Sequence, residues 1–221
     1  MLLIGQYDSP FVRRVAVTMN LYAIPFERRI LSVFSDFAAM LTINPLGKVP
    51  ALQLDDGELL FDSRAILDYL DGLVPPERRL LPPDEPHRRR VLRIEAVALG
   101  LAEELYERGF ELARRDPARR DAAVLQRVEQ QIACALSWLE ALRPSPWLHG
   151  DRITRADVTA AIAFTYMLEK QPMLLAPARC EALAAHCARC ESLSEFASAA
   201  YSAAEAQRSG WMPESAAPPA R

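Results

Sequence analysis

The segment 44–70 constrains the possible fold most strongly, because two prolines and a turn signal divide it into short elements. Pro45 disfavours a helical conformation at the preceding residue, so a helix before it should end there. Pro50 has no N–H group and suits the first residue of a strand or a sheet edge. An Asp-Gly pair at 56–57 is a type I′ hairpin signal between two short apolar runs. The segment therefore predicts a two-stranded hairpin, followed by a helix that begins at Asp62 and Ser63.

Two features of this segment suit a bound peptide. Val49 should be extended because a proline follows it, and its N–H and C=O could pair with another extended backbone, as in strand addition. The helix start at Asp62 and Ser63 offers free N–H groups and positive potential, which suit a carboxylate, while the Asp62 carboxylate suits an ammonium group. Glutathione, a peptide with a free amino-acid head, would satisfy both features. The structural alternative is that Asp62 or Ser63 only caps the helix and Pro50 only starts a strand.

Three motifs, taken in order, resemble those of the glutathione S-transferase family. Ser-Pro-Phe-x-Arg-Arg-Val at 9–15 is similar to the start of the first helix in its bacterial, serine-type members. Asn-Pro-x-Gly-x-Val-Pro-x-Leu at 44–52, with the hairpin and the acidic-Ser pair behind it, is similar to the family's peptide-binding segment. Gly-x-x-Ile-Thr-x-x-Asp at 150–157 is similar to the capping motif of its second domain. The resemblance covers about residues 2–204.

The pattern of apolar residues predicts an α/β domain over residues 1–74 with the element order βαβαββα. Ser9 should cap the first helix with Pro10 at its first position, and a second helix should run from Phe34 to the residue before Pro45. The mixed four-stranded sheet that results is the thioredoxin-like arrangement that the resemblance also implies. This domain is expected to bind glutathione.

Proline-rich residues 75–86 are predicted to be a linker. Residues 87–206 keep helical spacing throughout, which predicts an all-α domain for the second substrate and for dimer contacts. Within it Thr154 should cap a buried helix, and Asp157 should complete a variant capping box. That box is interpreted as a folding device without a catalytic part. Residues 207–221 are expected to form a mobile tail.

Composition argues against several classes of protein. The chain has 221 residues, about half of them hydrophobic, and a net charge of −3, which is typical of a soluble globular protein and does not favour nucleic acid or an anionic membrane as partner. No apolar run approaches a membrane span, and the first residues lack the basic lead and apolar run of a signal peptide. A cytoplasmic location is therefore expected.

The cysteines all lie in the second half, at 134, 180, 187 and 190. The Cys187-x-x-Cys190 spacing, with Cys180 and His186 nearby, is found in redox pairs and zinc sites. Here it falls within an Ala-rich helical stretch, whereas a redox pair would be expected at the helix start of a βαβ unit. Buried or unreactive thiols are the favoured interpretation, and no metal is expected.

Glutathione transfer needs a thiolate at neutral pH. A free thiol has a pKa of about 8.5, and lowering it by about two units requires roughly 2.7 kcal/mol of preference for the anion. A hydroxyl that donates to a charged sulfur supplies about 1.5–3 kcal/mol, and a helix N-terminus adds roughly 0.3–1. Ser9, at the start of the first helix, is the predicted donor. Tyr7 is the alternative, because some relatives use a tyrosine after the first strand, and a plain N-cap is the structural alternative for Ser9.

The resemblance implies a set of glutathione-binding residues: Ser9, Phe11, Lys48, Val49 through its backbone, Pro50 as a cis proline, Asp62 and Ser63. Lys48 matches a polar position that reaches the peptide's carboxylate. Asp62 differs from the longer Glu that many relatives carry. Tyr106 and Phe110 are candidates for the wall of the second-substrate pocket, with a place in the helical core as the alternative.

The function expected from these residues is conjugation of the glutathione thiolate to a small, hydrophobic electrophile by a homodimeric detoxification enzyme. The alternatives within enzymes are a glutathione-dependent isomerase, dehalogenase or disulfide-bond reductase. A further alternative is a non-catalytic member, like the stringent-starvation-type relatives that bind RNA polymerase. Ser9 together with the pair at 62–63 favours a working peptide site, although fold alone does not fix function.

Overall fold

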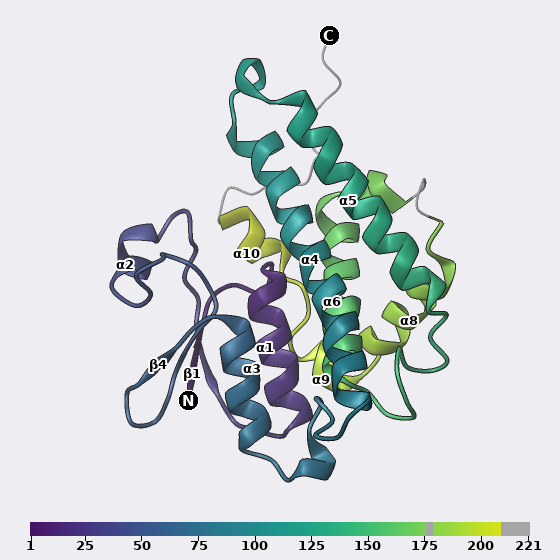
Figure 1. The fold of residues 1–221 in the computed structure, drawn as a ribbon. Coiled ribbons are helices and arrows are strands. Elements are labelled where there is room, and N and C mark those ends of the chain that lie inside the picture. The colour runs from purple at the N-terminus through teal and green to yellow at the C-terminus, as the bar shows by residue number, and fades with distance from the viewer. Residues whose placement is uncertain (176–178, 209–221) are drawn as a thin grey trace. The chain divides into compact units, whose positions relative to one another are not determined.

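A computed structural model of the chain describes residues 1–175 and 179–208 (Figure 1). The chain divides into two compact units. The first unit comprises residues 1–88 together with the described residues from 190 onward, and the second comprises residues 89–189. This division differs from the predicted helical domain 87–206, because the last helices of the chain group with the first unit. Most of the predicted tail, 209–221, lies outside the described residues.

A mixed four-stranded sheet lies at the centre of the first unit. Its strands are β1 (Leu2–Ile4), β2 (Glu27–Arg29), β3 (Ala51–Gln53) and β4 (Leu59–Leu60), in the order β2-β1-β3-β4. β1 is parallel to β2 and antiparallel to β3, with Leu3 opposite both Arg28 and Leu52. β3 and β4 are antiparallel. The predicted thioredoxin-like order βαβαββα is confirmed.

Helices α1 (Pro10–Leu21) and α2 (Phe37–Leu41) connect β1 to β2 and β2 to β3, and α3 (Ser63–Gly72) follows β4. α1 and α3 pack against each other, and the buried side chains of α1 include Val12, Val15 and Met19. These apolar positions recur at helical spacing, which is why one face of α1 can lie in the core.

α2 is shorter than the sequence predicted. The prediction began the helix at Phe34, but Phe34 lies in a turn and the helix starts at Phe37. The Ser32 hydroxyl accepts the N–H of Phe34, and the Asp36 carboxylate accepts the N–H of Ser32 at 2.9 Å. Such side-chain-to-backbone bonds offer the chain an alternative to helix, and they hold residues 32–36 in the turn.

The β3–β4 hairpin does not have the predicted type I′ turn. Leu54 N–H donates to the Glu58 carbonyl at 2.8 Å, and Gly57 N–H donates to the Leu54 carbonyl at 3.0 Å. Only Gly57 of the Asp-Gly pair has a positive φ, of 93°, whereas type I′ needs both residues there. The loop is instead a three-residue connection with glycine at its last position, and Asp56 binds the N–H of Glu58 through its side chain.

The second unit is helical. Its long helices are α4 (His87–Arg114), α5 (Ala122–Ala141), α6 (Arg155–Lys170) and α8 (Glu181–Glu191). Short 3₁₀ turns occur in it at η2 (Pro117–Arg119) and η3 (Pro172–Leu174), and a further one, η1 (Pro76–Arg78), lies in the first unit inside the predicted linker. The predicted apolar stripes are buried, including Ile94 and Leu105 of α4 and Ile132 and Leu139 of α5.

The predicted capping box at the start of α6 is present. Thr154 is the N-cap, and its backbone N–H and its hydroxyl both donate to Asp157 Oδ2, at 2.8 and 2.7 Å. The other oxygen of Asp157 accepts the N–H of Leu148 at 2.7 Å. Asp157 is fully buried, so its carboxylate also ties the preceding loop to the helix start.

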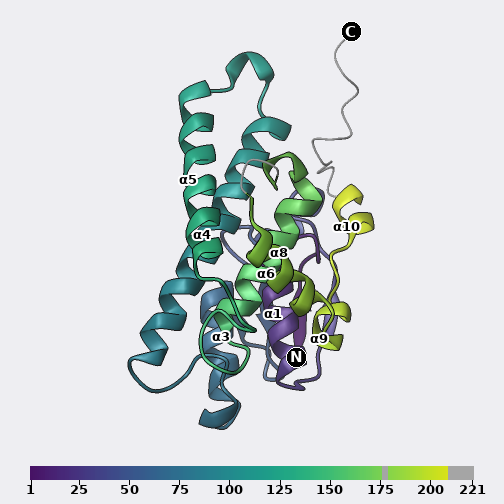
Figure 2. The ribbon, with the colours of Figure 1, turned by 90° about the vertical axis from the view of Figure 1, so that its right-hand side faces the viewer.

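Two short helices follow α8 and belong to the first unit: α9 (Ser194–Ala197) and α10 (Ala203–Arg208). Figure 2 shows α9 beside α1. We call residues 190–208 the C-terminal segment.

Candidate active site

Ser9 lies at the start of α1, as the sequence predicts. It is the N-cap, with an extended backbone (φ −80°, ψ 123°), and Pro10 follows it at the first helical position. Ser9 Oγ accepts the Val12 N–H at 3.4 Å. In the described part of the chain nothing accepts the proton of this half-buried hydroxyl. Capping and donation to a sulfur are therefore compatible roles, because the first uses a lone pair of Ser9 Oγ and the second uses its proton.

Tyr7, the alternative donor, lies two residues upstream and is 6% exposed. The Arg28 guanidinium lies over its ring, 3.3 Å from the centroid. Burial raises the pKa of Tyr7, and the neighbouring Arg28 lowers it while Glu205 raises it. The phenol therefore stays protonated at neutral pH. The choice between Ser9 and Tyr7 stays a prediction in favour of Ser9, which alone sits at the helix start.

The Val49–Pro50 peptide bond is cis, as the resemblance implied. In the described chain the Val49 N–H has no hydrogen-bond acceptor, so it is available to a bound peptide. Asn44 is almost fully buried, and its side-chain amide donates to the Lys48 carbonyl at 2.8 Å. This bond holds the loop that precedes Val49. The Lys48 side chain is exposed. These features suit the strand-addition role that the sequence predicted for this segment.

Gly5 brings the Val49 segment next to the start of α1, and the sequence reasoning missed it. Its φ is +137°, and a Cβ there would lie 2.5 Å from a methyl group of Val12 and 3.1 Å from the Val49 side chain. A side chain at this position would therefore push the two segments apart. A glycine at the end of the first predicted strand was the available signal.

Asp62 is the N-cap of α3, so the structural alternative considered for it is realised. Its Oδ1 accepts the N–H groups of Arg64 and Ala65, at 2.8 and 3.4 Å. Asp62 is exposed, and Ser63 is buried with its hydroxyl 3.4 Å from the guanidinium of Arg14. Arg14 comes from α1, so this contact joins α1 to the start of α3. The cap leaves Asp62 Oδ2 for an ammonium group.

Phe11 and the two aromatic candidates of the second unit are not core residues. Phe11 is half-buried at the second position of α1. On α4 the rings of Tyr106 and Phe110 have centroids 6.1 Å apart; Tyr106 is half-buried and Phe110 is 38% exposed. Burial raises the pKa of Tyr106, with a smaller contribution from Glu107. Both rings therefore present apolar surface, which suits the binding of a hydrophobic substrate.

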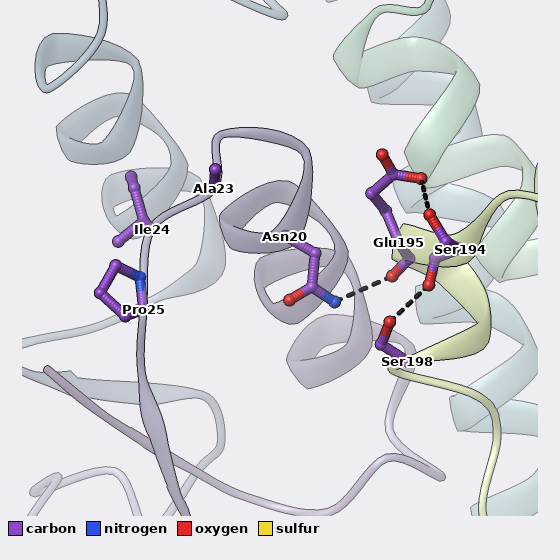
Figure 3. Close-up of a pocket in the computed structure, with 7 residues that line it drawn as sticks. All are labelled: Asn20, Ala23, Ile24, Pro25, Ser194, Glu195 and Ser198. Atoms are coloured by element: carbon purple, nitrogen blue, oxygen red, sulfur yellow. Dashed lines mark hydrogen bonds between the residues drawn. The ribbon is translucent and has the colours of Figure 1, made fainter.

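A shallow pocket of about 390 Å³ opens at the far end of α1 (Figure 3). Its lining residues are Asn20, Ala23, Ile24, Pro25, Ser194, Glu195 and Ser198. The Asn20 side chain points across it and donates to the Glu195 carbonyl at 2.9 Å. Because α1 has twelve residues, it separates this pocket from Ser9 by about 18 Å. The pocket is not the predicted glutathione site.

The cysteines of the described residues are all free thiols. Cys134 is exposed, whereas Cys180, Cys187 and Cys190 are buried. Burial raises the pKa of Cys180 to about 11, with a further contribution from Glu140, so this thiol is protonated and unreactive at neutral pH. Across residues 1–175 and 179–208 no group of three or more His, Cys, Asp or Glu side chains could hold a metal ion.

Within the same residues, no helix has the length and apolar character needed to cross a membrane.

Comparison with known proteins identifies the family. Residues 3–78 match the model of the glutathione S-transferase N-terminal domain, and residues 96–194 match that of the C-terminal domain. The uncharacterized GST-like protein YibF of Escherichia coli K12 is 32% identical over 76% of this chain and 82% of its own. The maleylacetoacetate isomerase of Pseudomonas aeruginosa is 30% identical over 69% of this chain and 74% of its own.

Solved structures of similar fold point to the same family. A glutathione S-transferase from Methylobacterium radiotolerans, in complex with glutathione sulfonate, has a TM-score of 0.83 and 31% identity over 90% of this chain and 93% of its own. A glutathione S-transferase from Methylobacillus flagellatus with glutathione bound has a TM-score of 0.84. It is 27% identical, over 91% of this chain and 99% of its own. The fold defines a thioredoxin-like domain joined to a helical domain. The chain belongs to the glutathione S-transferase family.

Proposed function

We propose that this protein is a glutathione transferase that conjugates the glutathione thiolate to a small, hydrophobic electrophile. The observation that carries the proposal is the hydroxyl of Ser9, held at the N-terminus of α1 with its proton not donated to any described residue. Two relatives of similar fold have glutathione or its sulfonate bound, which supports the tripeptide as the ligand.

In this proposal each part of glutathione has its own group of residues. The peptide backbone pairs with the free N–H of Val49. The amino-acid head binds at the start of α3, where the N–H and the hydroxyl of Ser63 face its carboxylate and Asp62 Oδ2 faces its ammonium group. The exposed Lys48 faces the carboxylate at the other end, and Phe11 covers the site.

The chemical step needs little beyond the thiolate. Ser9 Oγ–H donates to the sulfur, and the N-terminus of α1 adds positive potential, which together supply about the 2.7 kcal/mol that a two-unit fall in pKa requires. The anionic sulfur then attacks the electrophile, a carbon–sulfur bond forms, and the leaving group departs with its electron pair. No protein nucleophile is required. Tyr106 and Phe110 are proposed to contact the electrophile.

Isomerisation is the second candidate, because one relative at 30% identity is a maleylacetoacetate isomerase. The same thiolate would add to a double bond and leave again after rotation, so glutathione would be regenerated. Dehalogenation and disulfide reduction would also use the glutathione thiolate. Measuring glutathione consumption separates conjugation from isomerisation.

Titration calorimetry with glutathione, followed by a conjugation assay with chlorodinitrobenzene, tests the proposal. Binding with conjugation supports it. Binding without conjugation of this or other aryl and alkyl halides favours the narrower enzymes, and absence of binding favours a non-catalytic family member. A homodimer and a cytoplasmic location are part of the same proposal; light scattering should give about twice the 24.7 kDa of one chain.

Replacing Asp62 with asparagine should weaken glutathione binding about tenfold, because the ammonium group loses a charge-assisted hydrogen bond at an exposed site. Asparagine caps a helix as well as aspartate does, so the free energy of unfolding should be nearly unchanged. Asp68→Asn is the matched control, since Asp68 is an exposed residue of the same helix. An unaltered Kd in Asp62→Asn, measured by calorimetry, would contradict the assigned contact.

A further inference from the structure

The C-terminal segment is held against the domain that carries Ser9. Arg13 of α1 donates to both carboxylate oxygens of Glu191, at 2.8 and 2.5 Å, and to the Ala199 carbonyl at 2.6 Å. Asn20, at the other end of α1, donates to the Glu195 carbonyl. The family models end at residue 194, so the later part of this segment lies beyond what they describe.

Glu205, in α10, reaches the loop between β1 and α1. Its Oε2 accepts the backbone N–H of Tyr7 at 2.6 Å, and its backbone carbonyl accepts the side-chain amide of Gln6 at 2.7 Å. Arg28 of β2 donates to both carboxylate oxygens, at 3.0 and 3.1 Å, while its guanidinium covers the Tyr7 ring. Glu205 is 8% exposed and Gln6 is 5% exposed, so these contacts are shielded from water.

The contacts fall on the turn that ends at Ser9. Ser9 N–H donates to the Gln6 carbonyl at 3.1 Å, which closes a turn over residues 6–9. Glu205 binds two of the four residues of this turn, Gln6 through its side chain and Tyr7 through its backbone. A hydrogen bond to an ionised acceptor is about twice as strong as a neutral one, and it fixes the direction of the Tyr7 N–H.

The charge of Glu205 is compensated where it lies. A buried carboxylate is costly unless it is paired and hydrogen-bonded, and Arg28 together with the Tyr7 N–H meets both conditions. The Arg28–Glu205 pair has no net charge, so it does not oppose an anion at the neighbouring Ser9 as an isolated carboxylate would. Its effect on the site is therefore mechanical, through the backbone of the turn.

We propose that Glu205 is a positioning residue, which holds the 6–9 turn so that the Ser9 hydroxyl keeps its place at the start of α1. This inference rests on the proposed role of Ser9 in glutathione transfer. The C-terminal segment would then be part of the thiolate site although it does not touch the substrate.

Three variants of the full chain test this: Glu205→Ala, Glu205→Gln and Asn20→Ala. The two Glu205 variants have the same charge, but glutamine keeps an acceptor for the Tyr7 N–H. Asn20→Ala is the control, because it removes a hydrogen bond to the same C-terminal segment at the end of α1 remote from Ser9.

The first measurement is amide hydrogen exchange of a peptide covering the 6–9 turn, which needs no enzymatic activity. Exchange in this peptide should be about tenfold faster in Glu205→Ala, and within about threefold of wild type in Glu205→Gln and Asn20→Ala. Equal protection in Glu205→Ala and wild type would overturn the inference. If Glu205→Ala does not fold, Gln6→Ala should show the same direction of change, and unaltered exchange there would also overturn it.

The second measurement is kcat/KM for conjugation as a function of pH. Glu205→Ala should lose about tenfold near neutral pH, with an apparent thiol pKa above that of Glu205→Gln, because only the alanine variant releases the turn. Equal losses in both Glu205 variants would indicate a role of charge and overturn the inference. Wild-type protein that neither binds glutathione nor conjugates it would refute the proposed function, and the exchange result would still report whether Glu205 holds the turn.

Discussion

Ser9→Ala is expected to reduce kcat/KM for conjugation by about tenfold to a hundredfold, while the Kd for glutathione changes by less than about threefold. The Ser9 hydroxyl is the donor at the N-terminus of α1, and its loss removes about 1.5–3 kcal/mol of preference for the thiolate. The contacts assigned to the rest of the tripeptide, at Val49 and at the start of α3, are unchanged. Steady-state kinetics and calorimetry measure the two quantities separately.

The dependence of kcat/KM on pH shows in which direction Ser9 shifts the pKa of the glutathione thiol. A donor to the sulfur stabilises the anion, so it lowers the thiol pKa in the complex below its value of about 8.5 in water. Removing the donor should raise the apparent pKa in Ser9→Ala by about one to two units. The two enzymes should therefore differ most near neutral pH and converge in alkaline solution, where the thiol ionises without help.

Ser9→Gly is the matched control for loss of the helix cap. Alanine at an N-cap costs about 0.5–2 kcal/mol of stability, whereas glycine costs only a few tenths. Both variants lack the hydroxyl, so both should lose conjugation, although only Ser9→Ala should unfold more easily. Full activity in Ser9→Ala, with loss in Tyr7→Phe, would transfer the role to the Tyr7 phenol.

The sequence was most informative where a single residue determines the local backbone. Ser9 before Pro10 predicted the cap of α1, and Thr154 with Asp157 predicted the box at the start of α6; both are confirmed. The order of the motifs predicted the thioredoxin-like sheet and the helical second domain, which are also confirmed. The cis bond before Pro50 followed from the resemblance alone.

The sequence was least informative where side chains compete for the backbone or where distant segments meet. The Ser32 and Asp36 side chains hold a turn where apolar spacing predicted helix. Glu205 lies 198 residues from Tyr7, and nothing in the local pattern around it indicates that contact. Gly5 was visible as a glycine at a strand end, but its role depends on Val12 and Val49 lying on either side of it in space.

Replacing Asp157 with alanine is expected to lower the free energy of unfolding by about 3–5 kcal/mol. The buried N–H groups of Leu148 and Thr154 donate to different oxygens of this carboxylate. Each would lose its acceptor, at about 1–3 kcal/mol apiece, and the Thr154 hydroxyl, which donates to the same carboxylate, would lose its acceptor as well. For a chain of this length the melting temperature should fall by about 6–20 °C, which calorimetry or a urea titration would detect.

Asp157→Asn should be nearly as damaging, because an amide offers an oxygen to one of these N–H groups but turns its NH₂ toward the other. Asp151→Ala is the matched control: Asp151 is exposed in the loop before the same helix, and its loss should change stability by less than about 0.5 kcal/mol. The Asp157 variants should keep their kcat at temperatures where they remain folded, since Asp157 is assigned no chemical role. A selective loss of kcat in folded Asp157→Asn would show instead that the start of α6 takes part in the reaction.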